Sequence, residues 1–226
     1  VLFMKGFGVT RVGSKDPVDE NTLFMIGSNT KAFTATTIAI LQEEGKLTLN
    51  DKVQKWMPEF ALKDPLASNE IIIADLMSHR IGFETFQGDF TYWTSNLSRT
   101  DVIHKMALIN GLYSFRTKWG YCNAAFLTAG ELIPKITGKS WEETVKEKIL
   151  TPLKMNRTLM LSKELRKASN AAFPYTIVDG ILTELPIPSC HMPDTSAKCS
   201  GRKTCRYSIL STLSVSRSGR LRYAFC

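Results

Sequence analysis

The stretch GSNTKAFTATTIAILQEEGKLTLND, residues 27–51, decides the fold of this 226-residue chain. Small and apolar residues fill most positions from Thr30 to Glu44, and Gly45 stands where a helix ends on a left-handed residue. The preceding segment, Thr22–Ile26, is predicted to be a short strand. We therefore expect a strand that breaks at Gly27 into a helix that is apolar or small around most of its circumference and deeply buried.

Further strand and helix signals lie on both sides of this stretch. An N-terminal strand is predicted at Leu2–Val12. Helices are predicted at Ile72–His79, stopped by Gly82, at Arg99–Ile109, with Thr100 or Ser98 near its cap, at Tyr121–Thr137, ended by Gly138, and, from a capping box at Ser140–Glu143, to about Leu150. Strands that feed a buried helix, followed by a run of helices, predict an α/β fold with an all-helical region.

Ser28 and Lys31 are the first candidates for chemistry. Residues three apart share one face of a helix, so the Lys31 ammonium can reach the Ser28 hydroxyl. A neutral amine there could take the serine proton, whereas a charged amine would lower the pKa of a neighbouring base. The alternative is a helix cap with a solvated lysine. The same spacing recurs at Ser200–Lys203 without helical context, so the spacing alone is weak evidence.

A second pair of candidates, Tyr121 and Asn123, opens a later helix 93 residues after Ser28. The tyrosine could act as a general base, with its phenolate favoured by Lys31. Asn123 could hold a substrate amide. The alternative for this pair is a core tyrosine beside a helix-starting asparagine.

Four segments together resemble the class C β-lactamase-like family of penicillin-recognising serine hydrolases. They are GSNTKAFTATTIAILQEEGKLTLND, DLMSHRIGF, WGYCNAAFLTAGELIPKITGKSW and TPLKMNRT, in the order found in that family. The resemblance implies a β-lactamase/transpeptidase-like fold, with an antiparallel sheet, flanking helices and an all-helical region. It implies hydrolysis of an amide or ester bond in a β-lactam, a peptide or a carboxylic ester.

The resemblance also implies roles for single residues. Ser28 would attack a carbonyl, Lys31 and Tyr121 would manage its proton, and an acyl-enzyme would form and be released by water. The Ser28 backbone N–H would supply half of the oxyanion hole, and Asn123 would orient the substrate. No cofactor is implied.

The sequence departs from the family pattern beyond Ser28. The third motif, Lys-Thr-Gly or His-x-Gly on a core strand, is absent; Lys203-Thr204-Cys205 comes too early and lacks the glycine. We expect the C-terminal strands of the sheet to be missing. A relative that binds or acylates without turnover is therefore an alternative function. Ile81 and Lys154 replace a small residue and a glycine, respectively, which affects local turn geometry.

Composition divides the chain at residue 186. The segment 187–226 holds seven Lys or Arg against one acid, eight serines and four of the five cysteines, whereas 1–186 has 22 basic and 20 acidic residues. We interpret 1–186 as an incomplete hydrolase domain and 187–226 as an atypical basic tail. A basic-tailed module that binds polyanions is a lesser alternative; we expect a small-molecule substrate and no nucleic acid.

The remaining side chains point to no other chemistry. His79, His104 and His191 lack metal-ligand spacing, so no metal is expected, and Cys122 is predicted to pack in the core. The aromatic residues between Phe83 and Trp93 either line a substrate pocket or pack in the core. Glu142 and Glu143 are predicted on a solvated helix face. No segment is long and apolar enough to span a membrane.

The N-terminal sequence VLFMKGFGV, residues 1–9, has none of the features of a secretory signal. We therefore expect the chain to begin inside a fold. The family resemblance suggests a periplasmic or secreted protein, and the sequence leaves its oligomeric state open.

Overall fold

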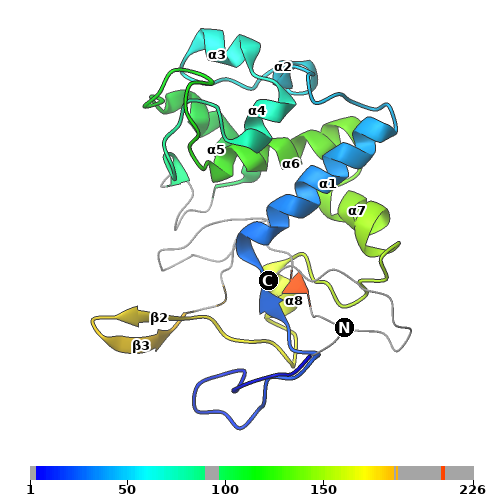
Figure 1. Ribbon diagram of the computed structural model, residues 1–226, viewed down its shortest axis with the longest axis vertical. Helices are drawn as coiled ribbons and strands as arrows, with labels where there is room; N and C mark the ends of the chain where they lie inside the picture. Colours follow the sequence, from blue (N-terminus) through cyan, green and yellow to red (C-terminus); the bar gives the residue numbers. More distant parts are fainter. Residues whose placement is uncertain (1–3, 90–96, 186, 188–209, 212–226) are drawn as a thin grey trace.

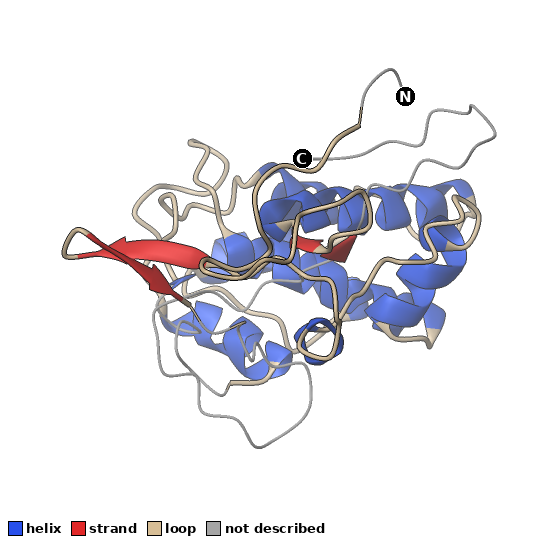
Figure 2. Cartoon of the chain, turned by 90° about the horizontal axis from the view of Figure 1, so that it is seen from below, coloured by secondary structure: helices blue, strands red, loops and turns tan. Residues whose placement is uncertain are grey.

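The structure is a computed structural model of the chain, and it describes residues 4–89, 97–185, 187 and 210–211. These residues form packed helices and two pairs of antiparallel strands (Figures 1 and 2). The elements are β1 (Phe24–Met25), η1 (Gly27–Asn29), α1 (Thr30–Glu43), α2 (Val53–Trp56), α3 (Pro65–Glu70), α4 (Ile73–Ser78), α5 (Arg99–Lys105), η3 (Met106–Leu108), α6 (Asn123–Thr137), α7 (Trp141–Val145), η4 (Lys146–Leu150), α8 (Ser162–Leu165), β2 (Tyr175–Val178), β3 (Ile181–Glu184) and β4 (Leu210–Ser211).

The centre of the helical region is α6, which packs against α1, α4, α5 and α7 (Figure 1). Ile38 and Leu41 of α1 and Leu132 and Ile133 of α6 have no solvent exposure and belong to one continuous apolar core. Burial of each such side chain contributes about 1.5–3 kcal/mol. The core therefore fixes α1 against α6.

The first helix is buried along one stripe only. Its buried residues are Thr30, Phe33, Thr34, Thr37, Ile38 and Leu41, at the three- and four-residue spacing of a single helix face. This face packs against α6, α7 and η4. Thr36 and Ala39 are exposed. The predicted deep burial therefore holds for one face of α1, and the opposite face is exposed although its residues are small.

The helix ends follow the predicted capping residues. Gly45 and Gly138 close α1 and α6 with φ of +70° and +71°, respectively. Ser98 and Ser140 start α5 and α7, and each accepts a hydrogen bond from the backbone N–H three residues later. Several boundaries differ slightly: α4 is Ile73–Ser78 rather than Ile72–His79, α5 gives way to a 3-10 turn after Lys105, and α6 begins at Asn123 rather than Tyr121. The helix predicted to about Leu150 is α7, which ends at Val145, followed by the π-helical turn η4.

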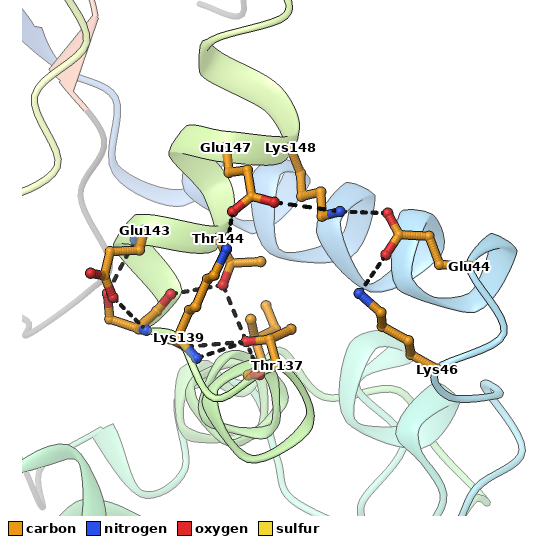
Figure 3. Close-up of polar contacts among 10 residues, drawn as sticks. Glu44, Lys46, Thr137, Lys139, Glu143, Thr144, Glu147 and Lys148 are labelled. Atoms are coloured by element: carbon orange, nitrogen blue, oxygen red, sulfur yellow. Dashed lines mark hydrogen bonds and ion pairs between the residues drawn. The ribbon is translucent and has the colours of Figure 1, made fainter.

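Ion pairs on the surface join the end of α1 to η4 (Figure 3). Lys148 Nζ lies 2.6 Å from Glu44 and 3.7 Å from Glu147, which also pairs with Lys139 at 2.5 Å. Exposed pairs of this kind contribute about 0–1 kcal/mol each. These ion pairs therefore contribute little to the contact between α1 and η4, which is stabilised mainly by the apolar core.

The strands form two small antiparallel pairs, β1 with β4 and β2 with β3. The β2–β3 hairpin extends away from the helices (Figures 1 and 2). Its two-residue turn is Asp179-Gly180, with φ of +50° and +81°, the geometry that suits a tight hairpin. This hairpin was not predicted.

The predicted N-terminal strand does not form in the part that the structure describes. Residues 4–12 make an isolated bridge, Val9 with Pro17, and no strand. Gly8 and Gly13 have φ of +76° and +83°, so the chain turns twice. Thr10 N–H then donates to Asp16 O and Val18 N–H to Gly8 O. A local loop therefore satisfies the backbone groups that a strand would have paired.

Of the predicted tail, the structure describes Ile187 and β4. Ile187 lies against a small apolar cluster of Leu23, Leu165 and Ala171. The rest of 187–226, including Lys203-Thr204-Cys205 and His191, lies outside the described residues, so the boundary at residue 186 stays a prediction. Within the part of the chain that the structure describes, no helix is long and apolar enough to cross a membrane.

The two departures from the family pattern have visible consequences. Lys154 has φ of +55°, a left-handed conformation that glycine adopts freely and a lysine adopts at a cost of about 1 kcal/mol. Ile81 is buried in the core, so its larger side chain is accommodated by packing.

Candidate active site

Ser28 lies at the junction between β1 and α1. Gly27, directly before it, has φ of +51°, which turns the chain without strain. Residues Gly27–Asn29 form one turn of 3-10 helix that continues into α1 at Thr30. Ser28 therefore lies at the N-terminal end of a long helix, where the helix dipole favours a developing negative charge.

Lys31 lies on the same face, one turn further along. Its Nζ donates to Ser28 Oγ at 3.4 Å and to Asn123 Oδ1 at 2.7 Å. The same nitrogen lies 4.6 Å from the centroid of the Tyr121 ring. An ammonium has three N–H donors and no acceptor, so it can hold both oxygens while facing the ring.

Tyr121 reaches Ser28 from the loop before α6. Its hydroxyl donates a hydrogen bond to Ser28 Oγ, and the two oxygens lie 2.5 Å apart. Asn123, the first residue of α6, is buried and holds Lys31. The structure thus brings Ser28, Lys31, Tyr121 and Asn123 into one hydrogen-bonded cluster, although 93 residues separate Ser28 from Tyr121.

The backbone of Tyr121 is held on both sides by the segment that follows Gly82. Its N–H donates to Thr85 Oγ1 at 3.2 Å, and its carbonyl accepts from the N–H of Phe86 at 2.8 Å. Phe86 itself has φ of +63°. These two hydrogen bonds fix the position of the Tyr121 backbone. They therefore help to set the distance between the Tyr121 hydroxyl and Ser28 Oγ.

His79 packs beside the cluster, which the sequence did not indicate. Its ring lies 4.6 Å from that of Tyr121 and 5.1 Å from that of Phe126, between centroids. Its Nδ1 accepts a hydrogen bond from the Cys122 N–H at 3.0 Å. Burial, followed by the charge of Lys31, lowers the pKa of His79 to about 4. A neutral histidine that is buried among aromatic rings has a structural role here.

Asp89 is a second neighbour that the sequence did not reveal. Its side chain has no solvent exposure, and its Oδ2 accepts a hydrogen bond from Asn123 Nδ2 at 2.8 Å. A single aspartate in an aromatic-rich run carries no motif, so only the tertiary contact identifies it.

Cys122 lies between two site residues and is not a nucleophile. It is completely buried, and burial is the main cause that raises its pKa to about 12. The thiolate that nucleophilic chemistry needs is therefore suppressed. The prediction that Cys122 packs in the core is confirmed.

The remaining candidates resolve into structural roles. Phe83 is a core residue, whereas Phe86 is half-exposed with its ring 5.5 Å from that of Tyr121; Phe90, Tyr92 and Trp93 lie outside the described residues. His104 is exposed. Among the described residues, no three His, Cys, Asp or Glu side chains gather as a metal site would require.

The predicted solvated acids also have local partners. Glu142 pairs with Arg99 at 2.5 Å, and Glu143 completes the capping box with Ser140. Both are therefore parts of helix packing and capping.

Comparison with known proteins agrees with this arrangement. The family described as Beta-lactamase matches residues 1–190. Penicillin-binding protein 4* of Bacillus subtilis (strain 168) is 27% identical over 202 residues, which are 87% of this chain and 43% of that protein. Teichoic acid D-alanine hydrolase of Staphylococcus aureus is 30% identical over 161 residues, 71% of this chain and 38% of that protein.

The fold is shared with solved structures. The octameric penicillin-binding protein homologue from Pyrococcus abyssi superposes with a TM-score of 0.76 at 27% identity, covering 94% of this chain and 47% of that one. The predicted β-lactamase/transpeptidase-like fold is confirmed. The chain spans less than half the length of each of these relatives.

Proposed function

The chain belongs to the Beta-lactamase family, and on that premise we propose that it is a serine hydrolase that cleaves an amide or ester bond through an acyl-enzyme on Ser28. The observation that carries the proposal is the pair of contacts on the Ser28 hydroxyl. Tyr121 OH lies 2.5 Å from it and Lys31 Nζ lies 3.4 Å from it. A capping serine needs neither contact, whereas an activated nucleophile needs a base within hydrogen-bond reach.

In the proposed first step, Ser28 Oγ forms a bond to the carbonyl carbon of the substrate. Its proton passes to the phenolate oxygen of Tyr121, which is the closer of the two contacts. The Lys31 ammonium, 4.6 Å from the centre of that ring, favours the phenolate by its positive charge. Tyr121 then gives the proton to the leaving nitrogen or oxygen as the bond to the carbonyl carbon breaks.

The acyl group then remains on Ser28 until water removes it. Water adds to the acyl carbon, its proton passes to Tyr121, and the proton returns to Ser28 as the acid leaves. The Ser28 backbone N–H, in the 3-10 turn directly before α1, is proposed as one oxyanion donor, and Asn123 as the residue that orients the substrate. Loss of one oxyanion donor costs about 10²–10³ in turnover, so the source of the second donor matters for rate.

The substrate class stays at the level of an amide or ester. β-Lactams, peptides and carboxylic esters all present the carbonyl that Ser28 would attack. One relative is named a teichoic acid D-alanine hydrolase and another a penicillin-binding protein, which fits esters and amides alike. We also propose a periplasmic or secreted location, in keeping with the family resemblance.

A chain that acylates once without turning over is the second candidate function. It is favoured by one observation: no Lys-Thr-Gly or His-x-Gly motif occurs among these 226 residues, and Lys203-Thr204-Cys205 lacks the glycine. Acylation and deacylation both pass through an oxyanion, so an incomplete oxyanion hole slows both steps. A reactive substrate can still acylate Ser28, and the less reactive acyl-enzyme then persists.

A burst assay separates the two functions. The protein is mixed with a chromogenic ester and, separately, with a chromogenic β-lactam, and product is followed against Ser28→Ala. A hydrolase releases product continuously. A single-turnover binder releases about one equivalent and stops. Equal release from the parent and from Ser28→Ala would refute both.

A further inference from the structure

Asp89 has no part in the proton transfers above, yet it is fully buried. Removing an ionised carboxylate from water is costly unless hydrogen bonds or opposite charge compensate it. Its Oδ2 accepts from Asn123 Nδ2 at 2.8 Å, and the other end of the same amide accepts from Lys31 Nζ at 2.7 Å. One neutral side chain therefore bridges an acid and a base inside the protein.

The two charges decide which way the Asn123 amide points. A carboxylate only accepts hydrogen bonds, and an ammonium only donates them. Asn123 must therefore present Nδ2 to Asp89 and Oδ1 to Lys31. Rotating the amide by 180° would set its NH₂ group against the ammonium and its oxygen against the carboxylate, and both bonds would be lost.

This chain of bonds ends at the nucleophile. Lys31, held by Asn123, also donates to Ser28 Oγ at 3.4 Å. Three further titratable groups lie close to these hydrogen bonds: Cys122, His79 and Tyr121. The pKa of Cys122, about 12, is raised chiefly by burial. The negative charge of Asp89 also raises this pKa, and the positive charge of Lys31 lowers it, so both charges act at the residue directly before α6.

We propose that Asp89 is a positioning residue: it holds the Asn123 amide in one orientation and thereby holds Lys31 against Ser28. The effect of Asp89 on the reaction rate rests on the proposed hydrolase function. The effect of Asp89 on the orientation of the Asn123 amide does not, so the two effects can be tested separately.

The first test exchanges the two side chains. Asp89→Asn, Asn123→Asp and the double variant are compared by their rates of reaction with a fluorophosphonate, read by intact mass. Asn123→Asp sets two carboxylates against each other and should slow the reaction at least 100-fold. The double variant restores one acid and one amide along the chain and should react at least about tenfold faster than Asn123→Asp.

Asp64→Asn is the matched control, because Asp64 is an exposed acid that caps α3. It should react like the parent. Melting curves set a temperature at which every variant is folded. A double variant that is no faster than Asn123→Asp would overturn the proposal, because a purely structural acid would give no rescue.

The second test does not depend on reactivity. Hydrogen exchange of the Asn123 side-chain NH₂ is followed by NMR in the parent, in Asp89→Ala and in Asp64→Asn. Exchange should be at least tenfold faster in Asp89→Ala and unchanged in Asp64→Asn. Unchanged exchange in Asp89→Ala would overturn the proposal. A parent that never reacts with the fluorophosphonate refutes the hydrolase function, and this measurement still decides the role of Asp89.

Discussion

The helical region around α1 and α6 and the β2–β3 hairpin are held together in opposite ways. In the helical region, apolar side chains such as Ile38 and Leu132 are fully buried. In the hairpin, the backbone is paired in full register, yet its apolar side chains are largely exposed: Ile177 70%, Val178 48%, Ile181 69% and Leu182 56%. One region is specified by side-chain packing and the other by its turn and its backbone hydrogen bonds.

This difference explains where the candidate site can form. Ser28 comes from η1, directly before α1, Lys31 comes from the first turn of α1, and Asn123 comes from the start of α6. Because α1 and α6 share one core, the distances within the site are set by helix packing. The hairpin contributes none of the four residues. Changes in the helical core should therefore reach the site, whereas changes in the hairpin should not.

The largest effect is expected from the core of α1. Leu41→Ala removes a side chain with no solvent exposure and should lower the free energy of unfolding by about 2–5 kcal/mol. Leu182→Ala in the hairpin is the matched control and should cost less than about 0.5 kcal/mol. Urea unfolding measures both. Equal costs would show that the two regions are packed alike.

The next effect concerns pH and the buried His79. Its pKa falls from 6.5 to about 4 on folding, chiefly through burial, so between these values the unfolded chain binds the extra proton. Stability should therefore be full above about pH 6.5 and decline as the pH falls towards 4. His79→Gln should flatten this part of the profile in thermal unfolding.

His104→Gln serves as the control for that profile, because His104 is exposed. It should keep the slope of the parent. If His79→Gln kept the same slope as well, the buried histidine would not be the source of the pH dependence.

A smaller effect is expected at the capping box of α7. Ser140 Oγ accepts from Glu143 N–H at 3.1 Å, and Glu143 reaches back to the Ser140 N–H at 2.9 Å. Ser140→Ala should cost about 1 kcal/mol in the free energy of unfolding. Ser114→Ala, at an exposed serine outside the helices, should cost nearly nothing. A loss of similar size in both variants would contradict the capping role.

The smallest effect is expected in the hairpin itself. Ile177→Thr keeps a β-branched residue on the strand and replaces a side chain that is 70% exposed. The free energy of unfolding, measured by thermal unfolding, should change by less than about 0.5 kcal/mol. Light scattering at high concentration should decrease, because an exposed apolar side chain has been replaced by a polar one. A marked loss of stability would mean that this side chain packs against something in solution.

Local signals in the sequence were sufficient for α1, α4, α5, α6 and α7 and for the contact of Ser28 with Lys31, whereas the short helices α2, α3 and α8 were not predicted. Gly45, Gly138, Ser98 and Ser140 act on the backbone within a few residues, so the ends that they predict are observed. The proximity of Ser28 to Tyr121 came from the order of family-like segments. Spacing alone would not have paired residues 93 apart.

What the sequence did not reveal depends on tertiary contacts or on an overlooked turn. Asp89 and His79 gain their places only when the segments before α6 fold against it. The alternation of apolar residues near the N-terminus predicted a strand, but the chain turns at Gly8 and Gly13 and forms a loop instead. The hairpin was predictable in principle, because Asp179-Gly180 between apolar runs is a strong turn signal.

The most direct test of the account is the site of covalent reaction with a fluorophosphonate. Parent protein and Ser28→Ala are incubated with the reagent, and intact mass and peptide mapping follow. One adduct, displaced fluoride and a modified Ser28 in the parent, with no adduct on Ser28→Ala, is the predicted result. No adduct on a folded parent, or an adduct that persists in Ser28→Ala, would contradict the claim that Ser28 is an activated nucleophile.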